Sequence, residues 1–299
     1  MLTISKQHTV FALSPNDPPA ARADSGDTVR FETLDCFGEQ ITNENQQLGG
    51  IDWARINPAT GPLYVSGALP GDTLKVEILS IELAPQAAVV EAPEEGITGL
   101  EAKAEVTKIL PIRDGKAIFN ARLALPLSPM IGVIGTAPAG DAVPTGTPAL
   151  HGGNMDCRRI GAGTTLYLPV NVEGALLAMG DLHALMGDGE VCVCGAEISG
   201  AVTVRVTVLK DAALPLPFLK TETDAMAIYS DESLDAAAAG ATLRMRRFLI
   251  EQVGMVESDA GMLLSLMGDL RICQAVDPNK TCRMELPCSL LEPYGYRFP

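Results

Sequence analysis

Aromatic side chains and basic residues are both scarce in this 299-residue chain. Phe, Trp and Tyr together make up 4% of the residues, so a hydrophobic core must be built mainly from Val, Leu, Ile, Ala and Met. Lys and Arg number 22 against 37 Asp and Glu, which gives a formal net charge of −15. Because such a chain repels phosphate groups, we expect neither nucleic acid nor an anionic membrane surface as a partner.

Long apolar runs and several familiar catalytic motifs are also missing. No uninterrupted apolar stretch is long enough to span a bilayer, and the N-terminus lacks the basic start and apolar stretch of a signal peptide. We therefore expect a cytoplasmic protein. The absence of a Gly-x-Ser-x-Gly elbow, a Walker loop and a Gly-x-Gly-x-x-Gly turn argues against a serine hydrolase and against a nucleotide-binding enzyme.

Cysteine is present without any Cys-x-x-Cys spacing. The seven cysteines are an odd number, so at least one thiol is unpaired within the chain. The spacing argues against a zinc ribbon or a thioredoxin-like site, and we expect buried, reduced thiols. Cys192 and Cys194 lie two apart on an expected strand, so their side chains should share one face. The sequence assigns no role to these two cysteines or to Cys157.

Hydrophobic patterns of period two dominate the first two thirds of the chain. The clearest strand is 201–210, in which β-branched residues alternate with polar ones. Further strands are expected at 29–35, 73–81, 105–110, 116–120 and 164–170, and the segment 84–99 is expected to be a surface loop. Many short strands separated by Gly and Pro turns favour a sandwich or jelly roll over parallel α/β units. The expected fold class is therefore mainly β, with a smaller α+β part at the C-terminus.

The last third of the chain changes to helical patterning. The expected elements are helices at 236–253 and 260–267, followed by strands at 271–276 and 281–286. Asp231 and Ser258 are expected to cap the two helices, and Gly254 is expected to end the first. We therefore divide the chain into a β-rich domain, 1–210, that carries the active site, and an α+β part, 211–299, packed on it.

Two of the three histidines lie in dense clusters of Gly and Asp. The first cluster is HGGNMDC at 151–157 and the second is GDLHALMGDGE at 180–190. Imidazole with carboxylates is the ligand set of many catalytic Zn²⁺ sites, and glycines let the backbone approach a ligand closely. Because the chain has so little histidine, this coincidence favours a divalent-metal site. His8 lies in an expected edge strand and is interpreted as structural.

Three other interpretations of these clusters stay open. Stretches rich in Asn, Asp and Gly are ordinary turns, and the sequence GDG at 187–189 could be a hairpin turn. A non-catalytic, metal-binding β-sandwich could hold a structural Ca²⁺ through Asp181, Asp188 and Glu190, although the imidazole would then be idle. A hydrolase that needs no metal could use Cys157 as its nucleophile.

These residues resemble the acetamidase/formamidase family over nearly the whole chain. The similarity is carried by the two histidine clusters and by GDTVRFETLD at 26–35, NPATGPLYVSGALPGD at 57–72, IGVIGTAP at 131–138, MRRFL at 245–249 and LLSL at 263–266. The resemblance implies a β-rich fold of CUB-like jelly-roll character with a smaller α+β part. It also implies hydrolysis of formamide- or acetamide-like substrates, a divalent metal in the site and homo-oligomers. Cys157, Cys192 and Cys194 depart from the usual family pattern, which bears on the substrate range.

On these grounds we predict a metal-dependent hydrolase that converts short aliphatic amides to carboxylate and ammonia. The expected ligands of the metal, which we expect to be Zn²⁺, are Asp35, His151, Asp156 and His183. Glu190 is predicted to act as general base and acid, and Asn154 to donate a hydrogen bond to the developing oxyanion. Asp181 and Asp188 would orient the ligands or bind a second ion such as Ca²⁺. The expected partners are a small amide substrate and further copies of the chain, with a dimer favoured.

Overall fold

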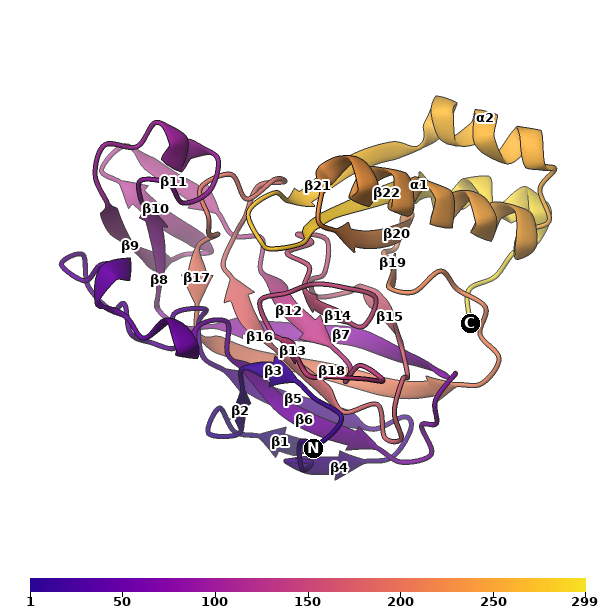
Figure 1. Cartoon of the computed structure of the whole chain (residues 1–299), viewed down its shortest axis with the longest axis horizontal. Coiled ribbons are helices and arrows are strands. Elements are labelled where there is room, and N and C mark those ends of the chain that lie inside the picture. Colours follow the sequence, from indigo (N-terminus) through magenta and orange to yellow (C-terminus); the bar gives the residue numbers. More distant parts are fainter.

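Two large β-sheets form the body of the protein in the computed structural model, which describes residues 1–299 (Figure 1). The first sheet has nine strands in the order β1 (Leu2–Ile4), β5 (Thr28–Thr33), β18 (Gly200–Leu209), β7 (Thr73–Leu83), β15 (Thr165–Pro169), β19 (Phe218–Lys220), β20 (Asp224–Asp231), β22 (Lys280–Pro287) and β21 (Asp269–Gln274). Within this sheet the strand pairings are antiparallel except that of β1 with β5. This arrangement confirms the expected mainly β fold.

The second sheet has eleven strands. Its main path runs β11 (Leu123–Pro126), β10 (Lys116–Asn120), β9 (Val106–Arg113), β8 (Gln86–Glu91), β17 (Glu197–Ile198), β16 (Leu177–His183), β12 (Met130–Gly135) and β14 (Gly152–Asn154). Strand β6 (Ala59–Val65) pairs with β16 and carries β2 (Thr9–Val10) and β4 (Ala21–Ala23). A separate pair joins β3 (Ala12–Leu13) to β13 (Val143–Pro144).

The main hydrophobic core lies between the two sheets. Val29 and Phe31 on β5 are buried and alternate with partly exposed neighbours, as a strand with one covered face requires. Val204 on β18 belongs to the same apolar cluster, which also takes in Ile131 from β12 and Leu182 from β16. Side chains from both sheets therefore interdigitate, which is the packing of a β-sandwich.

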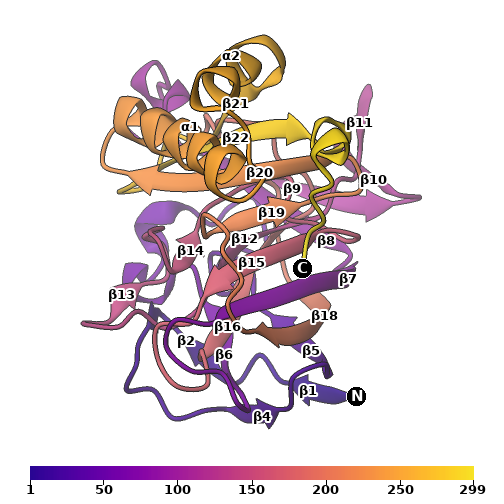
Figure 2. The same ribbon diagram turned by 90° about the vertical axis from the view of Figure 1, so that its right-hand side faces the viewer.

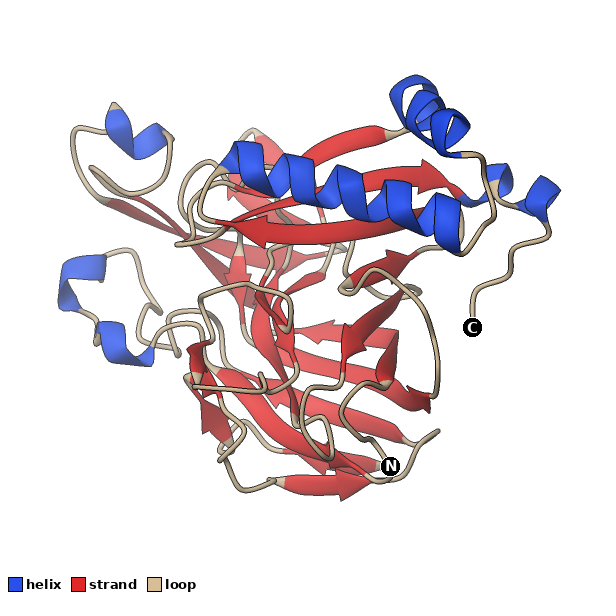
Figure 3. Ribbon diagram, turned by 45° about the vertical axis from the view of Figure 1, so that its right-hand side comes forward, coloured by secondary structure: helices blue, strands red, loops and turns tan.

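Two helices cover the C-terminal strands of the nine-stranded sheet. Figures 2 and 3 show α1 (Leu234–Glu251) and α2 (Glu257–Met267) on one side of β20 and β22. Met245 and Phe248 from α1 pack with Met284 and Leu286 from β22 in a second apolar cluster. The α+β part thus has its own core but shares a continuous sheet with the rest. Neither helix combines the length and apolar character needed to cross a membrane.

Several local expectations are corrected. Helix α1 is capped by Ser233, whose hydroxyl accepts from the Ala236 amide, and not by Asp231, which still belongs to β20. No side chain caps α2, which follows Val256 directly, so Ser258 lies within its first turn. The segment 84–99 contains strand β8, whose buried small residues give a weak pattern in an Ala- and Pro-rich sequence.

The strand expected to carry Cys192 and Cys194 does not form, so this prediction is wrong. Glu190 and Val193 have φ angles of 47° and 75°, in the left-handed region that a strand does not use. Cys192 and Cys194 therefore do not share a strand face, although both thiols approach the Val90 carbonyl oxygen. The remaining short elements are 3-10 helices: η1 (Leu48–Gly50), η2 (Trp53–Arg55), η3 (Thr98–Leu100), η4 (Cys288–Leu290) and η5 (Glu292–Tyr294).

Candidate active site

The central strand β16 positions the first two polar residues of the site. All seven residues of β16 are buried, because neighbouring strands flank it on both sides and the two sheets sandwich it. Asp181 and His183 lie at its C-terminal end, two residues apart. On the neighbouring strand β17, Glu197 is paired directly with His183. The strand register therefore fixes these three side chains relative to one another.

Four carboxylates surround the His183 imidazole. Their nearest oxygens lie 3.1 Å (Glu197), 3.4 Å (Asp181), 3.8 Å (Asp156) and 4.0 Å (Glu190) from His183 Nε2. All five side chains are almost completely buried. A fifth carboxylate, Asp277, comes from the turn between β21 and β22 and interacts with Asp156. We call these six residues the His183 cluster.

The His183 cluster carries more negative charge than its surroundings compensate. Burial raises the pKa of Glu190, and the charge of Asp156 raises it further. Burial likewise raises the pKa of Glu197 and of Asp277. For His183, burial favours the neutral ring, but Glu197 and Asp181 outweigh it and hold the pKa well above its usual value. No lysine or arginine pairs with any of the five carboxylates, so the cluster has the electrostatics of a cation site.

Backbone strain is concentrated in the same cluster. Asp156, Asp181 and Glu190 have φ angles of 42°, 54° and 47°. Left-handed geometry at a non-glycine residue costs roughly 1–3 kcal/mol and persists where the surrounding structure enforces it, often at functional sites. Three such residues in one cluster indicate that the fold holds these carboxylates in place against a local backbone preference.

The donor atoms of the cluster suit a divalent cation. In each of two groups, three donor atoms lie within 4.8 Å of one another. The first group has one atom each from Asp156, His183 and Glu190, and the second has one atom each from Cys36, Asp181 and Glu197. The buried oxygens without a hydrogen-bond partner include both of Asp156 and one each of Asp181, Glu190, Glu197 and Asp277. Buried polar atoms are normally paired, so this many orphaned oxygens around one imidazole fit a bound divalent ion.

Two glycines make room for the cluster. A Cβ on Gly132 would lie 2.5 Å from Asp156 Oδ1 and 2.7 Å from Asp181 Oδ2, so these two carboxylates converge on the open face of that glycine. A Cβ on Gly195 would lie 2.5 Å from His183 Nδ1. Any larger residue at either position would therefore displace a donor.

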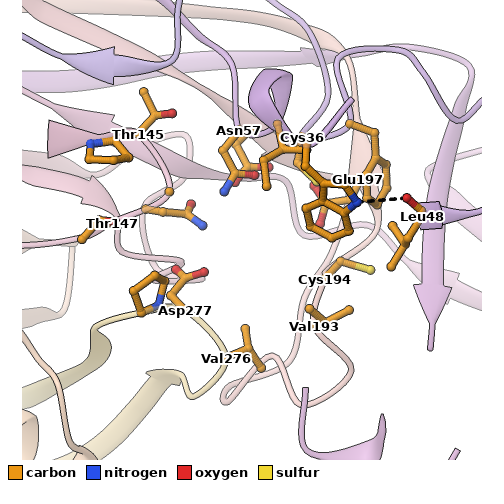
Figure 4. A pocket seen from close by; sticks show the side chains of 18 of the residues that line it. Cys36, Leu48, Asn57, Thr145, Thr147, Val193, Cys194, Glu197, Val276 and Asp277 are labelled. Carbon is orange, nitrogen blue, oxygen red and sulfur yellow. Dashed lines mark hydrogen bonds between the residues drawn. The ribbon is translucent and has the colours of Figure 1, made fainter. Parts of the chain in front are cut away.

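A cavity of about 570 Å³ leads to the cluster. The cluster members Asp181, His183, Glu190, Glu197 and Asp277 line it, together with Asn154 from β14, whose side-chain oxygen has no partner. Figure 4 shows Asp277, Thr145 and Thr147 on one side of this cavity, with Leu48, Cys194 and Val193 facing them. A small molecule in the cavity can therefore reach the carboxylates directly.

The structure brings together only part of the ligand set expected from the sequence. Asp156 and His183 meet in the cluster, whereas Asp35 lines a separate cavity and accepts a hydrogen bond from the Glu39 amide. Burial raises the pKa of Asp35 to about 6. His151 pairs with no carboxylate, and its burial lowers the pKa of the imidazole to about 4. Neither residue joins the donor groups.

Two further candidates also lie outside the cavity. Asp188 is paired through both carboxylate oxygens, at 2.7 and 2.8 Å, with the guanidinium of Arg283, so it is not free to bind an ion. Cys157 is completely buried in the core, where its thiol interacts with Cys273 and Arg283. A substrate in the cavity does not meet this thiol.

Sequence reasoning missed Glu197 and Asp277. Glu197 stands alone between Ala196 and Ile198 just before the strand that starts at Gly200, and a single carboxylate in such an apolar context was the available signal. Asp277 lies in the sequence VDPNK, which is ordinary turn composition and carries no signal of its own. Only the continuation of the nine-stranded sheet into the C-terminal part brings Asp277 to the cluster.

Comparisons with known proteins point to one family over nearly the whole chain. The sequence profile described as Acetamidase/Formamidase family matches residues 5–142 and 91–292. The crystal structure of an acetamidase from Bacillus halodurans superposes with a TM-score of 0.98 at 50% identity, covering 99% of this chain and 100% of that chain. A formamidase of Methylophilus methylotrophus is 27% identical over 75% of this chain and 72% of its own length. An acetamidase of Mycolicibacterium smegmatis is 29% identical over 66% and 64%. The chain spans between 63% and 72% of the length of its curated relatives.

Proposed function

This chain belongs to the acetamidase/formamidase family, and on that basis we propose that it is a metal-dependent hydrolase of linear primary amides such as formamide and acetamide. The observation that carries the proposal is the His183 cluster at the end of the cavity. Four buried carboxylates around one imidazole are costly unless a cation balances them, and the site opens to a space that a small substrate can enter.

Asp156, Asp181 and His183 are the residues that would hold the cation. The two carboxylates converge at Gly132, and their oxygens lie 3.8 and 3.4 Å from His183 Nε2. A donor set of imidazole and carboxylates favours Zn²⁺ over Ca²⁺, because Ca²⁺ prefers oxygen ligands alone. When bound, such an ion supplies Lewis acidity towards the amide carbonyl and makes a water molecule more acidic.

The hydrolysis itself requires one proton transfer across the reacting centre. A bond forms between the water oxygen and the carbonyl carbon, the carbon–nitrogen bond breaks, and a water proton moves to the nitrogen, so that a carboxylic acid and ammonia form. The acid then loses its remaining proton to become the carboxylate, and ammonia takes up that proton in solution. Glu190 would take that proton and pass it on, because its carboxylate lines the cavity and is, at 4.0 Å, the farthest of the four carboxylates that surround His183 Nε2. Asn154 lines the same cavity, and its amide N–H would donate to the carbonyl oxygen as negative charge develops.

The two other candidate functions have less support. A nucleophilic Cys157 would have to reach a substrate from a fully buried position outside the cavity. A Ca²⁺ module built on Asp181, Asp188 and Glu190 would need Asp188, which is occupied by Arg283. A homodimer and a cytoplasmic location stay predictions; light scattering of the purified protein tests the first.

Ammonia release from a panel of primary amides tests the proposal. Metal-replete protein is expected to release ammonia and the matching carboxylate in equal amounts from formamide or acetamide. The variant His183→Ala serves as the inactive control, because it removes the imidazole at the centre of the cluster. The absence of ammonia with every amide of the panel, from folded and metal-replete protein, would rule the proposed function out.

A further inference from the structure

We propose that the cavity selects primary amides whose acyl group is apolar and bulky, such as phenylacetamide or hexanamide, in preference to acetamide. This substrate class rests on the amide hydrolysis proposed above. It follows from the size of the cavity, from the apolar side chains that one segment contributes to its lining, and from the position of the single tryptophan.

The cavity is much larger than the smallest amides require. Its volume of about 570 Å³ lies within the range of roughly 300–1,000 Å³ that is typical of pockets that bury drug-sized ligands. A water molecule occupies about 30 Å³ in the liquid, so this space corresponds to on the order of twenty waters. Acetamide has only four non-hydrogen atoms and would leave most of the cavity filled with water.

One segment of the chain contributes a run of apolar side chains to the cavity. The carboxylates and His183 come from other segments, whereas residues 37–56 supply Phe37, Leu48, Ile51, Trp53 and Ile56; Phe11, Val193 and Val276 add further apolar side chains to the lining. Figure 4 shows Leu48 with Val193 and Cys194 across the cavity from Thr147 and Asp277. A ligand that contacts both the His183 cluster and the apolar side chains of 37–56 has a polar amide at one end and an apolar body at the other.

Trp53 is the clearest element of the apolar wall. It is the only tryptophan of the chain, it lines the cavity, and it remains 50% exposed. Its indole N–H donates to the Leu48 carbonyl oxygen at 3.1 Å, so the polar atom is satisfied by backbone and the ring is held by the hydrogen bond. An aromatic ring fixed in this way offers apolar contact area to a ligand at little entropic cost.

The wall that carries Trp53 is supported from behind. Leu48 and Phe37 are buried in an apolar cluster with Ile41, Val90 and Cys194, which connects the segment to strand β8. The apolar lining is therefore built on packed side chains of the fold. An acyl group that lies against Trp53 and Leu48 is removed from water while its amide group extends towards Glu190 and Asn154.

Turnover of an amide series tests this preference. The value of kcat/KM is expected to rise at least roughly tenfold from acetamide to hexanamide or phenylacetamide, because each methylene in an apolar pocket adds discrimination. Trp53→Ala should lower kcat/KM for phenylacetamide roughly tenfold more than for acetamide, and Trp53→Phe should restore most of it. The control Leu243→Ala removes a residue of similar exposure, 48%, on α1 outside the cavity, and should change neither value.

The fluorescence of Trp53 separates failure of the preference from failure of the proposed function. Phenylacetamide should change this emission saturably and at lower concentration than acetamide. Saturable binding without release of ammonia from any amide would support the apolar binding site and rule out the proposed hydrolase function. Hydrolysis that is fastest for acetamide, with no tighter binding of the larger amides, would overturn the proposed preference for bulky acyl groups. The proposed hydrolase function would then still be supported.

Discussion

Glu197 Oε1 lies 3.1 Å from His183 Nε2, and the two residues are direct partners in the pairing of β17 with β16. The same oxygen accepts a hydrogen bond of 2.7 Å from the Gly195 amide, so this backbone donor and the strand pairing together fix its position. A contact set by strand register is more exact than one set by a loop, and the orientation of the His183 ring depends on it.

Glu197→Gln should weaken metal binding by about 10–100-fold, because groups that orient a ligand typically contribute that much. The amide keeps the size of the side chain but removes its charge. Competition with a chromophoric chelator measures the affinity, and circular dichroism verifies the fold. Unchanged affinity in a folded variant would mean that Glu197 has no part in holding the ion.

Glu190→Gln should lower kcat at least roughly a hundredfold while bound metal is retained, because a general acid–base group contributes about 10²–10⁴-fold. The matched control is Glu95→Gln, which neutralises a carboxylate of the same cavity outside the His183 cluster and should leave kcat nearly unchanged. Loss of metal together with activity would make Glu190 a ligand, and a kcat close to that of the parent would exclude both roles.

Gly195→Ala should lower kcat/KM roughly a hundredfold, since a displacement of about 1 Å in an active site has effects of that size. The new Cβ would lie 2.5 Å from His183 Nδ1, so the buried ring must move. Gly187→Ala is the control in the same segment, because nothing lies within 4 Å of its Cβ position. Equal activity of the two variants would contradict the assigned geometry of His183.

Asp188→Ala should destabilise the protein by about 3 kcal/mol without changing the metal content of the folded molecules, because it leaves the buried Arg283 guanidinium without its bidentate partner. Urea unfolding measures the stability. The exposed pair of Asp269 with Arg271 provides the comparison, and Asp269→Ala should cost at most about 1 kcal/mol. Loss of metal from Asp188→Ala would instead support a second ion near this residue.

Strong local patterns were sufficient to predict much of the fold. The alternation of Val202, Val204 and Val206 with less buried neighbours predicted β18 to within one residue at either end, and the buried stripe of Ala241, Met245 and Phe248 predicted α1. Strand β8 was missed, because its small residues pack into the core without a strong apolar signal. The continuous sheet could not be foreseen either, since strand order depends on long-range pairing.

The site was predictable only where its residues were adjacent in sequence. The clusters around His151 and His183 drew attention to Asp156, Asp181 and Glu190, all of which lie beside the imidazole of His183. His151 appeared equally suitable, yet no carboxylate pairs with its ring, because proximity along a chain does not determine which side chains meet in the fold. Asp277 lies more than ninety residues after His183 in the sequence. Its contact with the cluster is therefore long-range, and no local pattern encodes it.

Elemental analysis of the protein combined with its rate of ammonia release tests the central proposal most directly. The His183 cluster predicts about one divalent ion, or a close pair, per chain in active protein. Removal of the ion by a chelator should abolish ammonia release, and added Zn²⁺ should restore it, because the buried carboxylates then regain their counter-charge. Full ammonia release from protein that contains no metal would contradict the proposal.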